Sequence, residues 1–144
     1  MPTGTRGKAA ERMVRQGLEA LSSKSSFNYM RLPDARAGSF QPTVADFLAV
    51  HKGFTHFLEV KEVQHAYRLP AKNFNLDQRA RLAAFRAAGA MAWVLVYFTP
   101  LKIWRCTSAA YFSDASATSW DMRDLPVVTL NEFFTLVFSN ESSS

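Results

Sequence analysis

Two short apolar segments near the middle of the chain predict a pair of β-strands. Residues 42–50 and 54–62 are rich in Val, Leu, Phe and Thr, and the turn residues His51–Gly53 lie between them. Apolar runs separated by a short turn that contains glycine are typical of an antiparallel hairpin. We take this hairpin as the centre of the predicted sheet.

Helical patterns flank the hairpin on both sides. In residues 8–21, apolar side chains recur every three or four positions, as they do on one face of a helix. A capping-box pattern at Asn75–Gln78 begins a second helix that ends near Gly89, and the apolar run Met91–Phe98 follows as a buried strand. A helix and a buried strand directly after a strand pair predict an α/β fold with a mixed sheet.

The remaining elements complete one domain over residues 1–144. We expect an edge strand at 27–32, a strand at 102–106, a helical turn at 108–112, a polar loop at 114–124, and a helix from a second capping box at 129–132 to about 138. Residues 1–7 are predicted to be a flexible arm, and residues 139–144 a frayed tail. The length suits a single hydrophobic core.

Charged residues interrupt both central strands. Asp46 stands in the first, and Glu59 and Lys61 stand two residues apart in the second. Because alternate residues of a strand point to the same face, Glu59 and Lys61 share a face, and Asp46 lies beside it if the strands pair. Charges at an apolar sheet are costly unless something compensates them, and a divalent cation would do so.

Composition and charge agree with a globular protein that binds a polyanion. Hydrophobic residues make up 48% of the chain, charged residues 20%, and the formal net charge is +5. Residues 101–144 hold only three Lys and Arg against five Asp and Glu, so the positive excess belongs to the earlier part of the chain, where the charged strands lie. This balance suits nucleic acid, although a basic surface without such a partner is also common.

The single cysteine and the polar N-terminal residues indicate a cytosolic protein. Cys106 has no second cysteine to pair with, so neither a disulfide within the chain nor a cysteine-rich zinc site can form. The first residues lack the apolar core of a signal peptide. The longest apolar run is far shorter than the roughly 18–20 residues that cross a bilayer, so no membrane association is expected.

The charged strand residues match the needs of phosphodiester hydrolysis. Mg²⁺, or Mn²⁺ in its place, prefers oxygen ligands, which Asp46, Glu59 and the carbonyl of Val60 can supply. Lys61 can then hold or deprotonate the attacking water. The alternative is a solvent-facing strand edge on which charges simply alternate.

At these residues the chain resembles the PD-(D/E)xK nuclease superfamily, and more closely the RecU-type Holliday junction resolvases. The resemblance covers roughly residues 40–98. It rests on Asp46–Gly53, on Phe57–Glu62, and on the basic connector Leu69–Phe74 with the downstream Gln78. The interval from Asp46 to Glu59 is also similar to that of archaeal Hjc resolvases.

The resemblance implies a restriction-endonuclease-like core, a mixed sheet flanked by helices, with a metal-dependent site. It implies that Asp46 and Glu59 bind the metal, that Lys61 is catalytic, and that Gln78 helps to order the site. It also implies that Glu11, from the first helix, reaches the metal as an accessory carboxylate. From the residues alone, Glu11 could instead be a solvated helix carboxylate, and Gln78 could serve only its helix cap.

Two positions depart from the family pattern. Ala45 stands where the superfamily has proline and RecU proteins have a hydroxyl residue. The segment 31–41 is too short for the projecting stalk that RecU proteins carry before the catalytic strand.

The expected function is resolution of four-way DNA junctions by a homodimer. Basic residues near the metal strands are the candidate phosphate contacts: Arg68, Lys72, Arg79 and Arg81. A junction has two-fold symmetry, which a two-fold dimer matches, and the apolar cluster in residues 133–138 is either its interface or plain core. The alternatives are a related nuclease for duplex or flap DNA, or a DNA-binding module with a weakened site.

Overall fold

The computed structural model describes residues 8–33 and 44–139 of this chain. The expected arm at 1–7, most of the loop between residues 33 and 42, and the tail from 140 onward lie outside the described residues.

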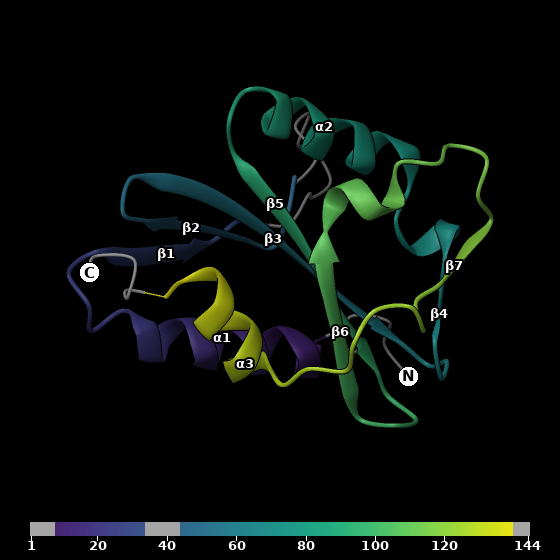
Figure 1. Ribbon diagram of the computed structural model, residues 1–144, viewed down its shortest axis with the longest axis horizontal. Coiled ribbons are helices and arrows are strands. Elements are labelled where there is room, and N and C mark those ends of the chain that lie inside the picture. Colours follow the sequence, from purple (N-terminus) through teal and green to yellow (C-terminus); the bar gives the residue numbers. More distant parts are fainter. Residues whose placement is uncertain (1–7, 34–43, 140–144) are drawn as a thin grey trace.

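A five-stranded mixed sheet forms the centre of the described chain (Figure 1), with the strand order β1-β2-β3-β5-β6. Three of the four pairings are antiparallel, and β3 runs parallel to β5. The strands are β1 (Phe27–Arg31), β2 (Phe47–His51), β3 (Phe54–Val63), β5 (Met91–Phe98) and β6 (Ile103–Ser108). The predicted hairpin and the buried strand after it are confirmed, and so is the α/β class.

Helices cover both faces of this sheet. Helices α1 (Lys8–Leu21) and α3 (Leu130–Val137) pack on one face, and α2 (Leu76–Ala87) lies over the other (Figure 1). Helix α1 buries Ala10, Val14 and Leu18, which recur four residues apart and so form one apolar stripe. Helix α2 buries only Leu82 fully, so most of its surface remains exposed.

The helix ends follow the predicted caps with one difference. The side chain of Thr129 and that of Glu132 satisfy each other's backbone N–H, which is a complete capping box. At α2, Asn75 Oδ1 accepts from the backbone N–H of Gln78 at 2.8 Å, but the Gln78 side chain does not return to Asn75. It forms other contacts in the site described below.

The crossover from β3 to β5 carries one strand of a small second sheet. Strand β4 (Arg68–Pro70) pairs antiparallel with β7 (Ser119–Asp121), and the short 3₁₀ helices η2 (Ala71–Asn73) and η3 (Ala109–Phe112) lie near them in the chain. The prediction of a polar loop over 114–124 was therefore wrong in part. Trp120, at the centre of β7, is only 8% exposed and packs edge-on against Phe112.

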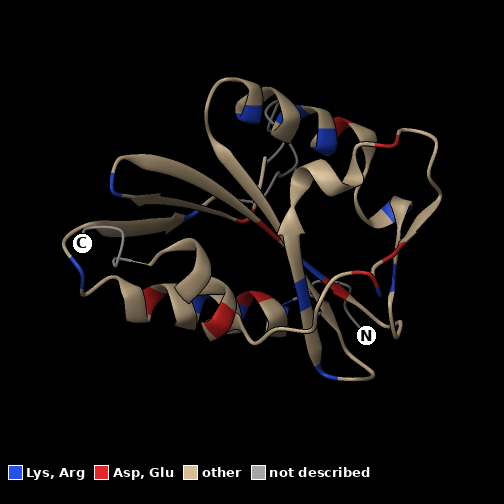
Figure 2. Cartoon of the chain, in the orientation of Figure 1, with Lys and Arg blue, Asp and Glu red and all other residues tan. Residues whose placement is uncertain are grey.

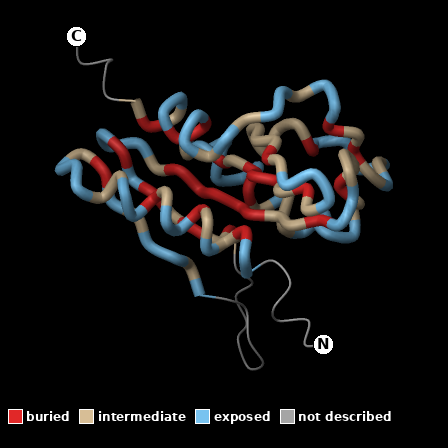
Figure 3. The backbone as a smooth tube through the Cα atoms, turned by 90° about the horizontal axis from the view of Figure 1, so that it is seen from below, coloured by how far each residue is buried: buried red, intermediate tan, exposed pale blue. Residues whose placement is uncertain are grey.

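The core consists of two apolar layers on opposite faces of the sheet. Strand β5 runs between them with Val94, Leu95, Val96 and Phe98 fully buried, and Figure 3 shows buried chain passing through the middle of the molecule. Its continuous apolar run therefore reflects a strand that is covered on both faces, as predicted.

The apolar cluster in residues 133–138 belongs to the core of its own chain. Phe133, Phe134 and Phe138 are at most 5% exposed and pack against α1 and the sheet. Of the two possibilities for the cluster, a dimer interface or plain core, these three residues show core packing, because the period of the short helix turns them inward. Val137 is half-buried, and Leu136 alone is strongly exposed, at 80%. No helix in the described ranges is long and apolar enough to cross a membrane.

Candidate active site

Asp46 lies one residue before β2, at the point where β2 and β3 begin to separate. Its backbone N–H donates to the Leu58 carbonyl at 3.1 Å, and the register pairs Phe47 with Leu58, so Asp46 is placed beside Glu59. Its Oδ2 accepts the backbone N–H of Val60 at 2.7 Å. This bond fixes the carboxylate against β3, although Asp46 itself is not in the strand as we had expected.

Glu59 and Lys61 form a buried ion pair on the same face of β3. Lys61 Nζ lies 2.8 Å from Glu59 Oε2, and the two side chains are 15% and 7% exposed. A pair so well removed from water has a large desolvation cost, and it is stable only when further polar groups satisfy the remaining donors and acceptors.

Gln78 supplies one of those groups from α2. Its Oε1 accepts from Lys61 Nζ at 3.4 Å, and its Nε2 donates to the Val44 carbonyl at 3.2 Å. The amide thus links the lysine to the chain that leads into Asp46. The Phe74 ring adds a cation–π contact, with Lys61 Nζ at 5.1 Å from its centroid. Lys61 is therefore held from several sides.

The electrostatics of the site oppose a second negative charge. Burial and the neighbouring Glu59 carboxylate raise the pKa of Asp46 to about 8, with a further contribution from Glu11. The Val60 N–H and the Lys61 ammonium lower the pKa of Asp46, but by less than burial and Glu59 raise it. Figure 2 shows acidic and basic positions close together along the central strand of the sheet. Two close carboxylates that one ammonium does not neutralise make a site that favours a cation.

The oxygen donors available here suit a hard divalent cation. The carboxylates of Asp46 and Glu59 lie side by side on one face. Because the N–H and C=O of one strand residue leave on the same side, the Val60 carbonyl faces the Asp46 side of β3. Within the described ranges, no group of three or more His, Cys, Asp or Glu side chains is arranged to hold a metal. Such a donor set resembles Mg²⁺ sites, which use one or two carboxylates and waters.

Glu11 lies near the site but is engaged elsewhere. It is close enough to raise the pKa of Asp46, yet its Oε1 accepts from the guanidinium of Arg31, with Nη2 at 3.1 Å. Arg31 is the last residue of β1. The carboxylate is therefore not simply solvated, and its contact with a metal stays a prediction.

The four basic residues predicted to contact phosphate are in different situations. Lys72 is exposed on η2, and Arg81 is paired with Asp77 on the outer side of α2 at 3.1 Å. Arg68 donates to Ser119 Oγ at 2.8 Å, within the β4–β7 sheet. Arg79 donates to the backbone carbonyls of Phe74, Phe112 and Asp114 and lies over the Trp120 ring. Its guanidinium therefore joins α2 to the chain after η3.

Sequence reasoning missed one polar contact beside the site. Glu62 follows Lys61 but points to the opposite face of β3, where its Oε1 accepts the backbone N–H of Ala10 at 3.0 Å. Ala10 lies in the first turn of α1, where N–H groups have no partner within the helix. The signal available in the sequence was the acidic residue directly after the site lysine. Its contact with the N-terminal helix is visible only in the folded chain.

The fold is shared with nucleases of known structure. A Holliday junction resolvase, Hjc from the archaeal hyperthermophile Archaeoglobus fulgidus, is similar with a TM-score of 0.59 and 22% identity, covering 85% of this chain and 98% of its own. The bacterial homing endonuclease I-Ssp6803I is similar with a TM-score of 0.57 and 10% identity, covering 100% and 98%. No family model matches the chain, and no curated protein sequence matches it significantly.

These similarities concern the fold. Both neighbours are matched over almost their whole length, so the sheet and its flanking helices correspond as one unit rather than as a fragment. The expected nuclease-like fold, a mixed sheet flanked by helices, is confirmed.

Proposed function

We propose that this protein is a divalent-metal-dependent endodeoxyribonuclease that acts on branched DNA, with the four-way junction as its preferred substrate. The observation that carries the proposal is the convergence of Asp46, Glu59 and Lys61 on one face of the β2–β3 pair. The shared fold with a junction resolvase and a homing endonuclease supports it.

Asp46, Glu59 and the Val60 carbonyl are the residues that would hold the metal. The raised pKa of Asp46 is the feature of this site that fits a cation, because a bound divalent ion would favour the ionised form of both carboxylates. When bound, Mg²⁺, or Mn²⁺ in its place, would supply Lewis-acid chemistry at the scissile phosphate. Glu11 remains a candidate accessory carboxylate if Arg31 releases it.

Lys61 would act on the attacking water or the phosphate. An ammonium has three N–H donors, and two of them point to Glu59 and Gln78. The third can hold the water or a phosphate oxygen in line for attack, which contributes positioning and charge stabilisation. Gln78 keeps the ammonium oriented and would not itself contact the substrate.

The junction preference and the assembly rest on the archaeal neighbour, which is a Holliday junction resolvase. A four-way junction has two-fold symmetry, so we infer a homodimer with paired sites, in the cytoplasm where DNA is recombined and repaired. Lys72 and Arg81, with Arg68 and Arg79 beside them, would contact phosphates next to the site.

A nuclease for duplex or flap DNA is the second candidate. The similarity to a homing endonuclease favours it, because that neighbour shares the fold across the whole of this chain. The two candidates use the same catalytic residues and differ only in the DNA that fits.

The test compares cleavage of a synthetic four-way junction, a flap and a linear duplex of the same sequence, with and without Mg²⁺. We expect Mg²⁺-dependent, symmetric nicking of the junction, and loss of cleavage but not of binding in Asp46→Asn and Lys61→Ala. Glu19→Gln, which removes an exposed carboxylate of α1 away from these residues, is the matched control and should cleave normally. Full activity of Asp46→Asn would exclude the proposed site, and preferred cleavage of duplex or flap would favour the second candidate.

A further inference from the structure

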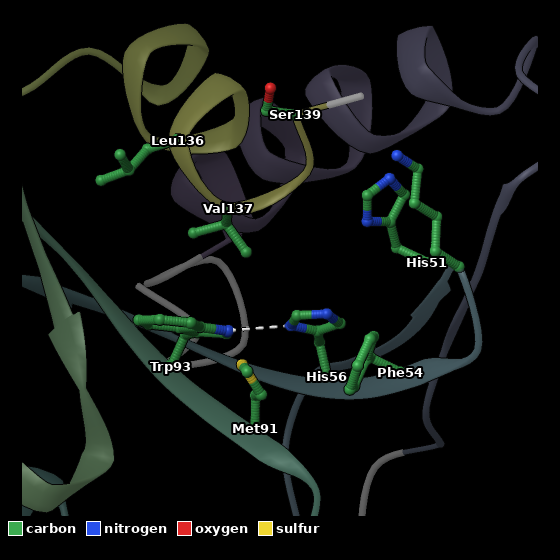
Figure 4. Close-up of a pocket in the computed structure, with 9 residues that line it drawn as sticks. His51, Phe54, His56, Met91, Trp93, Leu136, Val137 and Ser139 are labelled. Atoms are coloured by element: carbon green, nitrogen blue, oxygen red, sulfur yellow. Dashed lines mark hydrogen bonds between the residues drawn. The ribbon is translucent and has the colours of Figure 1, made fainter. Parts of the chain in front are cut away.

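A cavity of about 420 Å³ opens at the other end of the sheet from the candidate active site (Figure 4). The turn between β2 and β3, the start of β5 and the C-terminal end of α3 line it. His56, in β3, faces this cavity, while Glu59, three residues later, faces the opposite side of the sheet. The cavity is therefore separate from the acidic site.

A buried imidazole forms its floor. Trp93 Nε1 donates to His56 Nδ1 at 3.0 Å, and the two rings lie nearly parallel, with 15° between their planes. Phe138 contacts His56 edge-on from α3, with 4.9 Å between the ring centroids. His56 is only 3% exposed, so its ring is fixed by these neighbours.

The floor offers one hydrogen-bond donor to the cavity. Because Nδ1 accepts from Trp93, a neutral imidazole carries its proton on Nε2. Burial lowers the pKa of His56 to about 4, which keeps the ring neutral near pH 7. In residues 8–33 and 44–139, no group accepts from this Nε2–H. This N–H is the polar group that the floor presents to the cavity, and an oxygen of a ligand can accept from it.

The walls are apolar and the rim is basic. Phe54, Met91 and Leu136 are 59%, 42% and 80% exposed, so the chain leaves large apolar side chains in water around one opening. Lys52 lies in the turn at the rim, with a positive φ of 52°. Apolar walls, a neutral N–H donor and a cation together fit a ligand with a flat apolar body and an acidic group.

We propose that this cavity binds a small aromatic carboxylate. The ring would lie among Trp93, Met91 and Leu136, one carboxylate oxygen would accept from His56 Nε2–H, and the other would face Lys52. The proposal is independent of the nuclease site, because the cavity lies at the other end of the sheet.

The test uses 1-naphthoate as the probe, with 1-naphthalenemethanol as its neutral counterpart, titrated calorimetrically into the full chain. We expect saturable 1:1 binding of naphthoate, at least about tenfold tighter than that of the alcohol. Lys52→Asn should weaken naphthoate binding about fivefold and leave binding of the alcohol unchanged, since asparagine tolerates positive φ.

Lys102→Asn is the matched control, because Lys102 also has a positive φ, of 54°, in another turn of the protein. It should bind naphthoate like the original chain. Absence of saturable binding would overturn the proposal, and so would an equal effect of the two asparagine variants. Equal affinity for acid and alcohol would also overturn it, and would indicate an apolar groove suited to a side chain of a protein partner.

Discussion

The backbone N–H of Ala10 donates to the Oε1 of Glu62, the residue that follows the site lysine. Lys61 and Glu62 are neighbours on β3 but point to opposite faces, so one strand holds elements of both layers. Lys61 binds Gln78 of α2, and Glu62 binds the first turn of α1. Glu11 follows Ala10 in α1. Its position therefore depends on Glu62, which lies on the face of β3 opposite to Lys61.

Glu62→Ala should destabilise the protein by about 1 kcal/mol, because the first turn of α1 loses its acceptor and the helix dipole loses a stabilising charge. Urea unfolding measures this loss. Glu62→Gln keeps an acceptor oxygen and should recover more than half of the stability. Equal losses in the two variants would mean that the charge, and not the hydrogen bond, holds the helix.

Gln78 and Asn75 allow the cap and the site to be tested separately. Gln78→Ala removes the amide that orients Lys61 but retains the backbone N–H that Asn75 caps. We expect DNA cleavage to fall about tenfold in kcat with little change in DNA affinity. Single-turnover cleavage of the preferred DNA substrate measures this.

Asn75→Ala is the matched variant, because it removes the cap and leaves the Gln78 amide in place. It should cost about 1 kcal/mol of stability with normal cleavage by the folded protein. If Gln78→Ala were fully active, Gln78 would be only a structural residue of α2.

The buried His56 should make stability depend on pH. Its folded pKa, near 4, lies below the ordinary value of 6.5, so the unfolded chain binds the proton more readily. The contribution of the neutral His56 ring to the free energy of unfolding is therefore complete above about pH 6.5. It is lost as the pH falls toward 4, by up to about 3 kcal/mol. Protonation would also place a second N–H against the indole donor of Trp93.

Thermal unfolding between pH 4 and 7 measures this effect. His56→Phe should lower stability at pH 7 and remove the part of stability that rises with pH, so that the opposite contribution of Asp46, whose pKa is raised, dominates the slope in this range. His65→Gln, at an exposed position, should keep the original slope. An unchanged slope in His56→Phe would assign the pH dependence to other groups.

Gly17 should tolerate no side chain, because α1 and α3 meet there. A Cβ at this position would lie 2.5 Å from Cε2 of Phe134. Gly17→Ala gains about 1 kcal/mol in helix propensity but overpacks the contact, for a cost of about 1–3 kcal/mol. We expect a net loss of stability in urea unfolding.

Two further variants isolate the clash at Gly17. Gln16→Ala, at an exposed position of the same helix, should not be destabilising. Phe134→Leu should lose less stability when combined with Gly17→Ala than the single effects predict. Strict additivity would show that the ring is not the obstacle.

Local patterns predicted the elements well. The recurrence of apolar residues over 8–21 predicted α1, and the caps at Asn75 and Thr129 began α2 and α3 at the observed residues. These features depend on neighbours three or four residues away, which the sequence displays directly. The placing of Glu59 and Lys61 on one face followed from strand alternation alone.

Contacts between distant segments could not be predicted in this way. The contacts of Arg79 with carbonyls 33 and 35 residues further along the chain were not predicted, and neither was its contact with a nearby carbonyl. Glu11 was expected at the metal and is paired with Arg31. Phe133 and Phe134 were ambiguous because a short apolar helix can face its own core or a partner equally well.

The parallel pairing of β3 with β5 has a consequence for how the protein acquires its activity. Parallel neighbours require a crossover, and here the crossover contains α2, which brings Gln78 to Lys61. The lysine gains its orienting partner only when α2 has packed over the sheet. Under the proposed function, a chain whose crossover has not yet packed should therefore lack the ordered lysine and should not cleave DNA.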